Sequence, residues 1–499
     1  MEQGDAVGVG TILVTGASGY IGSRLVPLLL AQGHAVRAMS RDASRLRGRG
    51  WDAAELVEAD ALVPETLPAA LKSVHTCYYL LHSMASTGSF EAKDRLAAAN
   101  FAHAAREAGV RHIIYLGGLG ETSAALSPHL RSRMEVGRIL RGSGVRVTIL
   151  RAAIVIGAGS ASFEIMVDLV RNLPLMVVPR WMATRCQPIA IRDVLAYLVG
   201  ILAVPDCWGQ DYDLGGPDVL TYRAMLEQLA AEMGRRIVII PVPLLTPRLS
   251  STWISLFTSV SVPLIRALVE SLRNEVVVHN RAIEACIPLV KTSYRDAIRL
   301  AFVRIATQTV QSRWSGSPGP ARVQAYPGYI TPVRPDETAF SDRREQVLPV
   351  DIETAYRAVA QVGGDVGWYY ASWLWWLRGW LDRLVGGPGY RRGRRHPQDL
   401  LPGDTVNFWR VEAVDRPFYV LLRAEMKLPG TAWLEFELEE LEPGRSRVVQ
   451  TAYFHARGLA GEAYWLGISP LHAYIFRGLL AGIGRAATIM AGLSEGSRD

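Results

Sequence analysis

A glycine-rich run near the start of the chain constrains the fold more than any other feature: Thr15-Gly16-Ala17-Ser18-Gly19-Tyr20-Ile21-Gly22. It follows an apolar, β-branched segment at 11–14 and opens an apolar helical segment at 22–32. The three glycines allow a tight turn, let a pyrophosphate approach the backbone, and let the helix pack closely on the sheet. N–H groups at the helix start can then hold phosphate. In this setting the run predicts a dinucleotide-binding loop rather than a bare turn.

The end of the next predicted strand indicates which dinucleotide is bound. Ala35–Met39 is followed by Ser40-Arg41, where an NAD-binding protein usually carries an acid for the ribose hydroxyls. Arg41 and Arg45 can instead hold a 2′-phosphate through forked hydrogen bonds. The alternative is that these arginines only solvate a loop. We therefore expect NADP(H) in preference to NAD(H).

Residues 10 to about 150 alternate short β-branched runs with helical stretches such as 91–108, which Gly109 closes. The predicted strands are 11–14, 35–39, 77–81, 112–116 and 145–150. This alternation predicts an α/β domain with a Rossmann-like, doubly wound parallel sheet. From 151 to about 305 the rhythm is less regular, which indicates the last strands of the sheet and a substrate lobe.

The second half of the chain has a different character. Residues 306–340 are rich in proline, glycine and serine, which is linker composition. Beyond 341, Leu434, Phe436 and Leu438 alternate with glutamates, which predicts a strand with one buried and one wet face. Runs at 405–414, 418–427 and 446–456 would pair with it as an antiparallel meander, and a helix from about 471 to 493 would pack across. We expect a separate α+β domain over 341–495.

The glycine loop, Ser40-Arg41, the Asp60 of VEAD and the run VRHIIYLGGLG together resemble the atypical short-chain dehydrogenase/reductase superfamily, over residues 10–300. Its members include NmrA-like regulators and NADPH-dependent reductases. The resemblance implies that three further segments line the cofactor: Asp60-Ala61 at the adenine, Leu80-Leu81-His82-Ser83 after the fourth strand, and Gly117-Gly118 beside the nicotinamide ribose. For Asp60, a turn or a helix cap is the alternative.

The catalytic residues of that superfamily are replaced here. In catalytic members, a Tyr-x-x-x-Lys helix supplies the proton, and a serine after the fifth strand binds the substrate carbonyl. Here the helix is matched by the segment His129-Leu130-Arg131-Ser132-Arg133, and the serine position by Gly117 or Gly118. Arg133 can hold ribose hydroxyls but cannot hand on a proton. His129 and His82 are chemically plausible acids because imidazole titrates near neutrality, although a lone histidine is more often structural. Hydride transfer itself needs only a nicotinamide and a well-placed acceptor, so reduction remains a hypothesis.

The substrate side is less defined. The run from Gln187 to Val194 is similar to the segment that joins sheet and substrate lobe in extended members, so Gln187, with Trp181 nearby, could face a ligand. The alternative is a strand end with a helix cap at Asp193. Apolar residues from Trp253 to Leu268 keep helical spacing and predict a lid, an interface, a membrane-touching helix or a plain buried helix.

A tryptophan- and arginine-rich segment stands out in the second domain. Residues 368–395 contain Trp368, Trp373, Trp375, Trp376 and Trp380, and then Tyr390-Arg391-Arg392-Gly393-Arg394-Arg395. The indoles of Trp373, Trp376 and Trp380 fall on one helix face, and clustered arginines attract carboxylates, phosphates or lipid headgroups. Alternatively, the tryptophans fill the core and the arginines pair with acids such as Asp382 and Asp404. The order of elements in this domain resembles START-like helix-grip domains, which enclose an apolar ligand.

Composition limits the partners and the compartment. The net charge of +7 over 499 residues is only mildly basic, and no nucleic-acid-binding motif is present, so we expect no nucleic-acid partner. The spacing of the four cysteines predicts neither a metal site nor a disulfide, which favours a reducing cytoplasm. Neither a secretion signal nor an 18-residue apolar run is found. We expect a cytoplasmic protein, with peripheral membrane contact through the tryptophan-rich segment left open.

These observations leave three hypotheses. The first is an NADPH-dependent reductase of a hydrophobic carbonyl or enone. The second is a regulator that senses NADP(H) without turnover, and the third is a protein that binds lipid or another hydrophobic ligand at the membrane surface.

Overall fold

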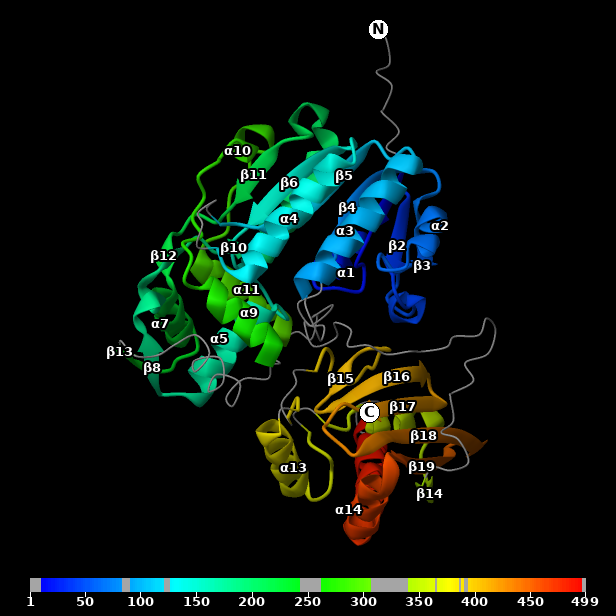
Figure 1. Ribbon diagram of the computed structural model, residues 1–499. Helices are drawn as coiled ribbons and strands as arrows, with labels where there is room; N and C mark the ends of the chain where they lie inside the picture. The colour runs from blue at the N-terminus through cyan, green and yellow to red at the C-terminus, as the bar shows by residue number, and fades with distance from the viewer. Residues whose placement is uncertain are drawn as a thin grey trace. The chain divides into compact units, whose positions relative to one another are not determined.

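The computed structural model describes residues 10–82, 90–120, 126–242, 262–306, 340–363, 366–385, 387–389 and 394–495. The chain divides into two compact units, unit 1 (Met1–Pro320) and unit 2 (Ala321–Asp499) (Figure 1). This boundary falls inside the stretch predicted as a linker, of which residues 307–339 lie outside the described residues.

Unit 1 is built on a seven-stranded sheet in the order β11-β6-β5-β4-β1-β2-β3, in which every pair is parallel. The predicted Rossmann-like sheet is therefore confirmed. The strand order changes direction between β1 and β4, and in such sheets ligands bind outside the carboxyl ends of the strands at that point. The strands are β1 (Thr11–Val14), β2 (Val36–Ser40), β3 (Glu55–Glu58), β4 (Val74–Tyr79), β5 (His112–Gly118), β6 (Arg146–Ala152) and β11 (Asp211–Leu214).

Helices cover both faces of this sheet. The face with α1 (Gly22–Ala31) and α6 (Ile191–Gly200) buries Ile12 and Val14, whereas the other face buries Leu13. Successive strand residues point to opposite faces, so covering both faces requires apolar residues at every position, as the β-branched runs show. The second face is covered by α2 (Leu67–Leu71), α3 (Phe90–Glu107) and α4 (Pro128–Gly142).

The predicted substrate lobe is a second apolar core of unit 1, built from short strand pairs and helices. Its strand pairs are β7 (Val155–Ile156) with β10 (Ile189–Ala190), β8 (Leu175–Pro179) with β13 (Val238–Val242), and β9 (Arg185–Cys186) with β12 (Leu220–Thr221). Its helices are α5 (Ala161–Asn172), α7 (Tyr222–Glu232), α9 (Val262–Ser271) and α11 (Tyr294–Ala306). Of the apolar stretch predicted as a helix, the part before α9, including Trp253, lies outside the described residues.

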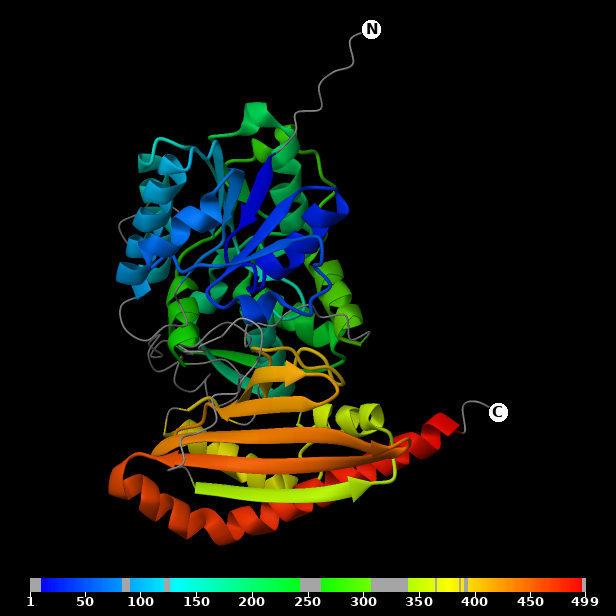
Figure 2. The same cartoon turned by 90° about the vertical axis from the view of Figure 1, so that its right-hand side faces the viewer.

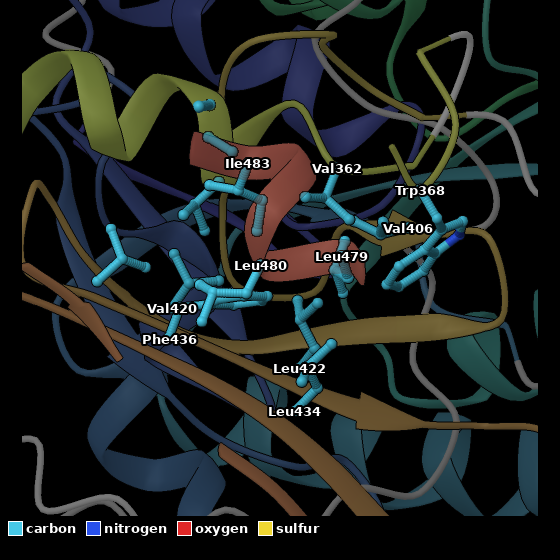
Figure 3. Packing of buried hydrophobic residues seen from close by; sticks show 14 of the residues in the cluster. Val362, Trp368, Val406, Val420, Leu422, Leu434, Phe436, Leu479, Leu480 and Ile483 are labelled. Atoms are coloured by element: carbon cyan, nitrogen blue, oxygen red, sulfur yellow. The ribbon is translucent and has the colours of Figure 1, made fainter. Parts of the chain in front are cut away.

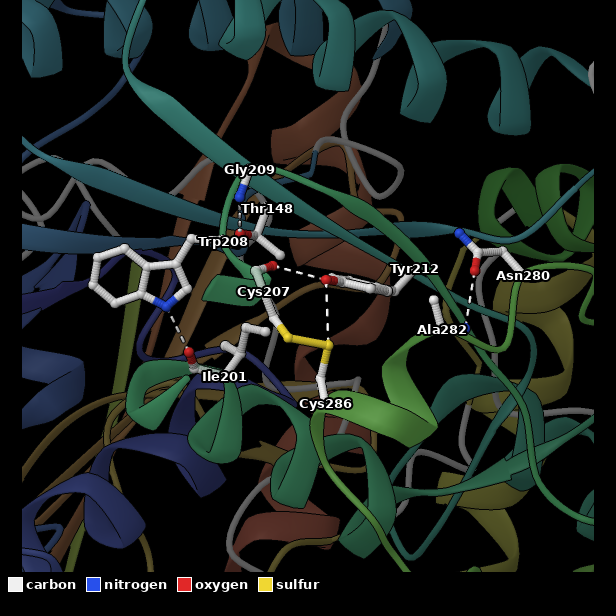
Figure 4. Close-up of a disulfide and its surroundings, with 9 residues drawn as sticks. All are labelled: Thr148, Ile201, Cys207, Trp208, Gly209, Tyr212, Asn280, Ala282 and Cys286. Atoms are coloured by element: carbon white, nitrogen blue, oxygen red, sulfur yellow. Dashed lines mark hydrogen bonds between the residues drawn. A yellow bond between two sulfur atoms is a disulfide. The ribbon is translucent and has the colours of Figure 1, made fainter. Parts of the chain in front are cut away.

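Short helical turns complete unit 1: η1 (Ala43–Leu46), η2 (Pro64–Thr66), η3 (Arg180–Ala183), η4 (Ile201–Ala203), η5 (Pro205–Cys207) and α10 (Ile283–Cys286). Two of these turns meet through a disulfide between Cys207 and Cys286, which are 79 residues apart (Figure 4). The prediction of no disulfide is wrong for this pair. Sequence spacing cannot reveal such a pair, because only the fold brings η5 beside α10. The Tyr212 hydroxyl donates to the Cys207 carbonyl at 2.9 Å and joins the same contact.

Unit 2 contains a six-stranded antiparallel sheet in the order β14-β19-β18-β17-β16-β15. The long helix α14 (Gly458–Glu495) packs against β14, β19 and α12 (Figure 2). The predicted antiparallel meander with a C-terminal helix is confirmed. The other elements are β14 (Phe340–Leu348), α12 (Ile352–Ala360), α13 (Ser372–Leu384), β15 (Thr405–Val406), β16 (Trp409–Asp415), β17 (Tyr419–Ala424), β18 (Gly430–Glu442) and β19 (Arg445–Ala456).

Two predicted boundaries in unit 2 are wrong. The strand predicted over 405–414 is a hairpin, because the chain reverses at Asn407 (φ +54°) and Val406 lies opposite Trp409. The last helix begins at Gly458 rather than near 471, since it continues through Pro470. Gly458–Gly492 of this helix is long and apolar enough to cross a membrane by length and composition alone. Polar residues interrupt it, so it contains no unbroken run of 18 apolar residues. The core helix of a soluble protein passes the same test.

The core of unit 2 lies between the sheet, α12 and α14 (Figure 3). Leu434, Phe436 and Leu438 point into it, as predicted. Glu435, predicted to be wet, is only 2% exposed. Its carboxylate accepts hydrogen bonds from the hydroxyls of Tyr419 at 2.7 Å and Tyr453 at 2.9 Å, so neighbouring strands cover and satisfy it.

Candidate cofactor and substrate site

The glycine loop lies directly after β1 and leads into α1. Gly16 has a φ of +62°, which favours glycine, and the Gly19 N–H donates to its carbonyl at 2.9 Å. A Cβ on Gly22 would lie 2.5 Å from the Gly16 carbonyl oxygen and 2.8 Å from the Cα of Ala17. Ile21 is the N-cap of α1 and makes no side-chain cap, and the N–H groups of Ser23 and Arg24 donate to the carbonyls of Gly19 and Ile21, both at 3.0 Å. The cradle therefore fits a dinucleotide pyrophosphate.

The end of β2 lies beside this loop. The Ala17 N–H donates to the Met39 carbonyl at 3.1 Å, and the hydroxyls of Ser18 and Ser40 are 3.4 Å apart. Arg41, the next residue, is exposed. Arg45, in contrast, is buried and forms an ion pair with Asp42 at 3.4 Å. The two predicted phosphate ligands thus differ, since Arg41 is open to solvent and Arg45 already holds an acid.

Asp60 and Ala61 follow β3 at the same edge of the sheet. The Asp60 carboxylate accepts from the Leu62 N–H at 2.9 Å, which is a turn-capping contact. The Ala61 carbonyl accepts from the Asn100 side chain of α3 at 2.8 Å. The turn-cap alternative for Asp60 is therefore present in the structure, and its adenine contact stays a prediction.

The carboxyl ends of β4 and β5 complete the edge. The Thr15 hydroxyl donates to the Tyr78 carbonyl and accepts from the Leu80 N–H, both at 3.0 Å, so Thr15 ties the loop to the residues after β4. At the end of β5, a Cβ on Gly118 would lie 3.1 Å from Leu130 of α4. Gly118 thus lets α4 come close to the site, whereas a Cβ on Gly117 would lie 3.1 Å from the Tyr115 ring. Ser83 lies outside the described residues.

Arg133 of α4 is held in a buried ion pair. Its Nη2 donates to the Asp94 carboxylate of α3 at 3.4 Å and to the Leu81 carbonyl at 3.2 Å. The Ser132 hydroxyl donates to the same carboxylate at 3.1 Å. Burial disfavours the charge of Arg133, but the Tyr115 ring and Asp94 outweigh this and raise its pKa. Arg133 therefore fixes α4 against α3 and the segment after β4, and its ribose contact stays a prediction.

The two histidines lie near Arg133, whose charge acts on both imidazoles. Burial and then the positive charge of Arg133 lower the pKa of His129 to about 3. For His82, which is exposed to solvent, desolvation by neighbouring atoms and then the charge of Arg133 lower the pKa to about 4. Both imidazoles are thus neutral at pH 7. They can donate a neutral N–H hydrogen bond, but they offer no protonated acid near neutrality.

Comparisons with known proteins agree with this geometry. Residues 16–169 match the family model described as NAD(P)H-binding, and residues 334–479 match a family described as protein of unknown function, DUF2867. Unit 1 carries an NAD(P)H-binding domain of the atypical short-chain dehydrogenase/reductase type. Unit 2 carries a DUF2867 domain.

Three similar proteins illustrate the match of the NAD(P)H-binding domain. The maize protein named divinyl chlorophyllide a 8-vinyl-reductase is 28% identical over 47% of this chain and 62% of its own length. The NAD(P)H azoreductase of Xenophilus azovorans is 27% identical over 45% of this chain and 74% of its own length. Among solved structures, Citrobacter triphenylmethane reductase with NADP(H) is 18% identical, covers 58% of this chain and 99% of its own, and has a TM-score of 0.48.

Gln187, predicted to face a ligand, has both ends of its amide bonded to the backbone of this domain. Its Nε2 donates to the Gly216 carbonyl at 2.6 Å, and its Oε1 accepts from the Val278 N–H at 3.0 Å. These contacts favour a structural role. The proposed cap, Asp193, instead accepts from the N–H and hydroxyl of Thr292 at 2.7 and 2.9 Å. Trp181 lies in η3, and its side chain is outside the described residues.

The Tyr20 side chain points away from the predicted phosphate position. A Cβ on Gly157 would lie 2.5 Å from the Tyr20 hydroxyl, so the ring reaches the segment after β7. The Arg24 guanidinium lies 4.0 Å from the centre of this ring and donates to the Ala158 carbonyl at 2.8 Å. Burial raises the pKa of Tyr20 to about 12. The ring therefore joins the loop to the second apolar core of unit 1, which leaves only the Tyr20 backbone for the predicted phosphate contact.

Sequence reasoning missed Asp94 and Asn100, two polar residues of α3 that support the site. A signal for Asp94 was present, since it occurs on the same helical stripe as Ala97, Ala98 and Phe101, which are buried. A carboxylate on a buried stripe requires a partner, and Arg133 supplies one. Among the described residues, no group of three or more histidine, cysteine or acidic side chains could hold a metal ion.

Proposed function

We propose that this protein is an NADPH-dependent reductase of a hydrophobic carbonyl or enone. The observation that carries the proposal is the glycine loop after β1, which packs so closely on the start of α1 that a Cβ at Gly22 would clash with the loop backbone. It lies at the point where the strand order reverses, where such folds bind dinucleotides. Three similar proteins are named as reductases, from maize, Xenophilus azovorans and Streptomyces griseus, which supports the reaction class.

The preference for NADP(H) is part of this proposal and rests on the end of β2. Arg41 is exposed beside the Ser18–Ser40 contact, where the adenosine ribose lies in this fold. Its guanidinium can take a 2′-phosphate in a forked contact. Arg45 is engaged with Asp42, so we assign the phosphate contact to Arg41 alone.

The residues around the nicotinamide position then have distinct roles. When bound, NADPH supplies a hydride. His82 and His129, neutral at pH 7, would donate hydrogen bonds to the substrate oxygen. The proton that completes the reduction would come from water. Arg133, paired with Asp94, is a positioning residue for α4.

A second candidate function is an NADP(H) sensor without turnover. The observation that favours it is the replacement of the tyrosine and lysine by His129 and Arg133, of which one is neutral at pH 7 and the other is held in an ion pair. Such a site would keep the cofactor contacts and lack the proton relay.

One experiment separates these candidates. NADPH binding is measured by fluorescence, and NADPH oxidation is followed with a panel of quinones, enones and azo dyes. We expect wild type to bind and oxidise NADPH, and Gly19→Asp to do neither, because its carboxylate would repel the phosphates. Binding without oxidation by any compound would support the sensor. Absence of NADPH binding would contradict both functions.

For unit 2 we propose a START-like helix-grip arrangement that holds an apolar ligand. The packing of α14 against β14 and β19 supports the arrangement. The indole N–H groups of Trp375 and Trp409 are buried, have no hydrogen-bond partner among the described residues, and would suit a ligand oxygen. Mass spectrometry of small molecules that co-purify with the full chain tests this proposal. Finding no apolar compound in protein purified from its native host would count against it.

A further inference from the structure

Helix α13 presents an apolar face to solvent, although unit 2 has a buried apolar core of its own. Trp373, Trp376 and Trp380 are 66%, 52% and 49% exposed. Figure 1 shows α13 lying outside the sheet of unit 2. The exposed apolar side chains of this helix together form what we call the α13 face: Trp373, Trp376, Leu377, Trp380, Leu381 and Leu384. Large exposed apolar patches mark sites of interaction in soluble proteins.

The opposite side of α13 anchors the helix firmly to unit 2. The indole of Trp375 stacks on Trp368 with ring centres 4.1 Å apart. Asp382 is fully buried, and its carboxylate accepts from the N–H groups of Lys427 at 2.7 Å and Gly389 at 2.9 Å. Because these contacts fix the rotation of the helix, the three exposed tryptophans cannot turn into the core.

The residues just before α13 fix its start as well. Tyr369 and Tyr370 lie against Gly482 and Gly478 of α14, where a Cβ would come within 2.5 and 2.0 Å of the tyrosine atoms. The Tyr370 ring also meets the Tyr474 ring edge to face, with centres 5.2 Å apart. The α13 face is therefore a rigid surface of unit 2.

The charges of α13 complement a negative surface. Asp382, the single acidic residue of the helix, is turned inward and bonded to backbone amides. The two basic residues, Arg378 and Arg383, are half-buried, and the Nη2 of Arg378 donates to the Lys427 carbonyl at 3.1 Å, which holds its charge beside the apolar face. The whole chain carries a net charge of +7. An apolar face rich in tryptophan with basic residues at its border is the pattern of a helix that lies in the interface of an anionic bilayer.

We propose that the α13 face docks unit 2 onto an anionic lipid bilayer. Thirteen helical residues extend over about 20 Å, which is less than the roughly 30 Å of a bilayer's hydrocarbon core, so the helix lies flat rather than spanning. The indoles enter the headgroup region, and the positive charges of Arg378 and Arg383 attract the anionic lipids. This inference is independent of reductase activity.

The test is flotation of the full-length protein with vesicles. Two compositions are used, phosphatidylcholine alone and phosphatidylcholine with phosphatidylglycerol. Wild type is expected to bind the anionic vesicles and to be released by high salt. The triple variant Trp373→Ser/Trp376→Ser/Trp380→Ser is expected to bind at least about tenfold less, because it loses the buried apolar area.

A matched control replaces three exposed apolar residues elsewhere in unit 2: Val347→Ser, Phe418→Ser and Leu441→Ser. This control is expected to bind like wild type. Circular dichroism and thermal unfolding check that both triple variants fold. If the tryptophan triple variant does not fold, the single variant Trp373→Asp replaces it, since Trp373 is the most exposed of the three.

Three outcomes would overturn the proposal. The first is absence of binding of wild type to anionic vesicles. The second is binding of the folded tryptophan variant at the wild-type level. The third is a wild-type dimer in light scattering that the tryptophan substitutions dissociate, without vesicle binding, because the face would then join two copies of the chain.

Discussion

The two sheets of this protein place their polar groups differently. The parallel sheet of unit 1 is covered on both faces, and the polar groups of its candidate site lie at the carboxyl edge, around the glycine loop and the Asp94–Arg133 pair. The antiparallel sheet of unit 2 is covered on one face, and its other face carries a bonded network around Glu435. The comparison teaches that a buried polar cluster does not by itself mark a binding site, because neighbouring side chains can satisfy it, as two tyrosines do for Glu435.

The largest expected effect comes from removing the buried Asp94–Arg133 ion pair between α3 and α4 of unit 1. Asp94→Ala leaves the Arg133 guanidinium buried and without its carboxylate, which should lower the free energy of unfolding by about 3–5 kcal/mol. Urea unfolding followed by circular dichroism measures the change. Glu135→Ala is the control, because Glu135 pairs with Arg95 between the same two helices at the surface and should contribute only about 0–1 kcal/mol. Equal losses in the two variants would show that the buried pair gives no special support.

The next largest effect is expected on NADPH affinity, from a substitution in the glycine loop. Gly22→Ala puts a Cβ 2.5 Å from the Gly16 carbonyl oxygen, so the cradle must distort, and NADPH affinity should fall about 100-fold, or about 2.7 kcal/mol. Titration calorimetry measures it. Gly142→Ala, at the end of α4, is the control because its Cβ meets nothing within 4 Å. Unchanged affinity in Gly22→Ala would place the cofactor elsewhere.

A smaller effect is expected on the outer face of unit 2. Tyr419→Phe removes one of the two hydroxyls that satisfy the buried Glu435 carboxylate, which should lower the free energy of unfolding by about 1–3 kcal/mol without changing NADPH affinity. Thermal and urea unfolding of the full chain measure the change. Tyr464→Phe is the control, since its hydroxyl makes no hydrogen bond within the described part of the chain. A weakened NADPH affinity in Tyr419→Phe would mean that this face does more than stabilise the fold.

The smallest expected effect is on the pH dependence of stability, through the lowered pKa of His129. The unfolded chain protonates His129 near its ordinary pKa of 6.5, whereas the folded chain holds it neutral down to about 3. Its contribution to stability is therefore full above pH 6.5 and is lost as pH falls below that value. His129→Gln should remove this loss. The urea midpoint of the wild type should fall between pH 7 and pH 5, and that of the variant should fall less, by on the order of 0.3 M.

The exposed residue His103 of α3 provides the control for that pH series. His103→Gln should keep the wild-type pH dependence. If His129→Gln also keeps it, then the imidazole of His129 does not experience the burial and the Arg133 charge that lower its pKa.

Features set by local chain geometry were predictable from the sequence. The glycine loop follows from steric limits on φ and from the close approach of helix to sheet, both of which act within eight residues. Continuous apolar strands predict a sheet covered on both faces, and alternation in β18 predicts one buried face. Helical spacing likewise placed Trp373, Trp376 and Trp380 on one side of a helix.

Features set by contacts between distant segments were not predictable in this way. Cys207 and Cys286 meet because η5 lies beside α10, and Arg133 meets Asp94 because α4 packs on α3. Glu435 is buried only because two tyrosines of adjacent strands reach its carboxylate.

The sequence by itself therefore determined where a dinucleotide phosphate can be held, since that requires only a local backbone shape. The tertiary structure decided which polar groups remain free to act. It committed Arg45, Gln187 and Arg133 to internal partners and left Arg41 and the α13 face exposed. The physical reason is that burial makes each polar group find a partner, and the partner is known only once the chain has folded.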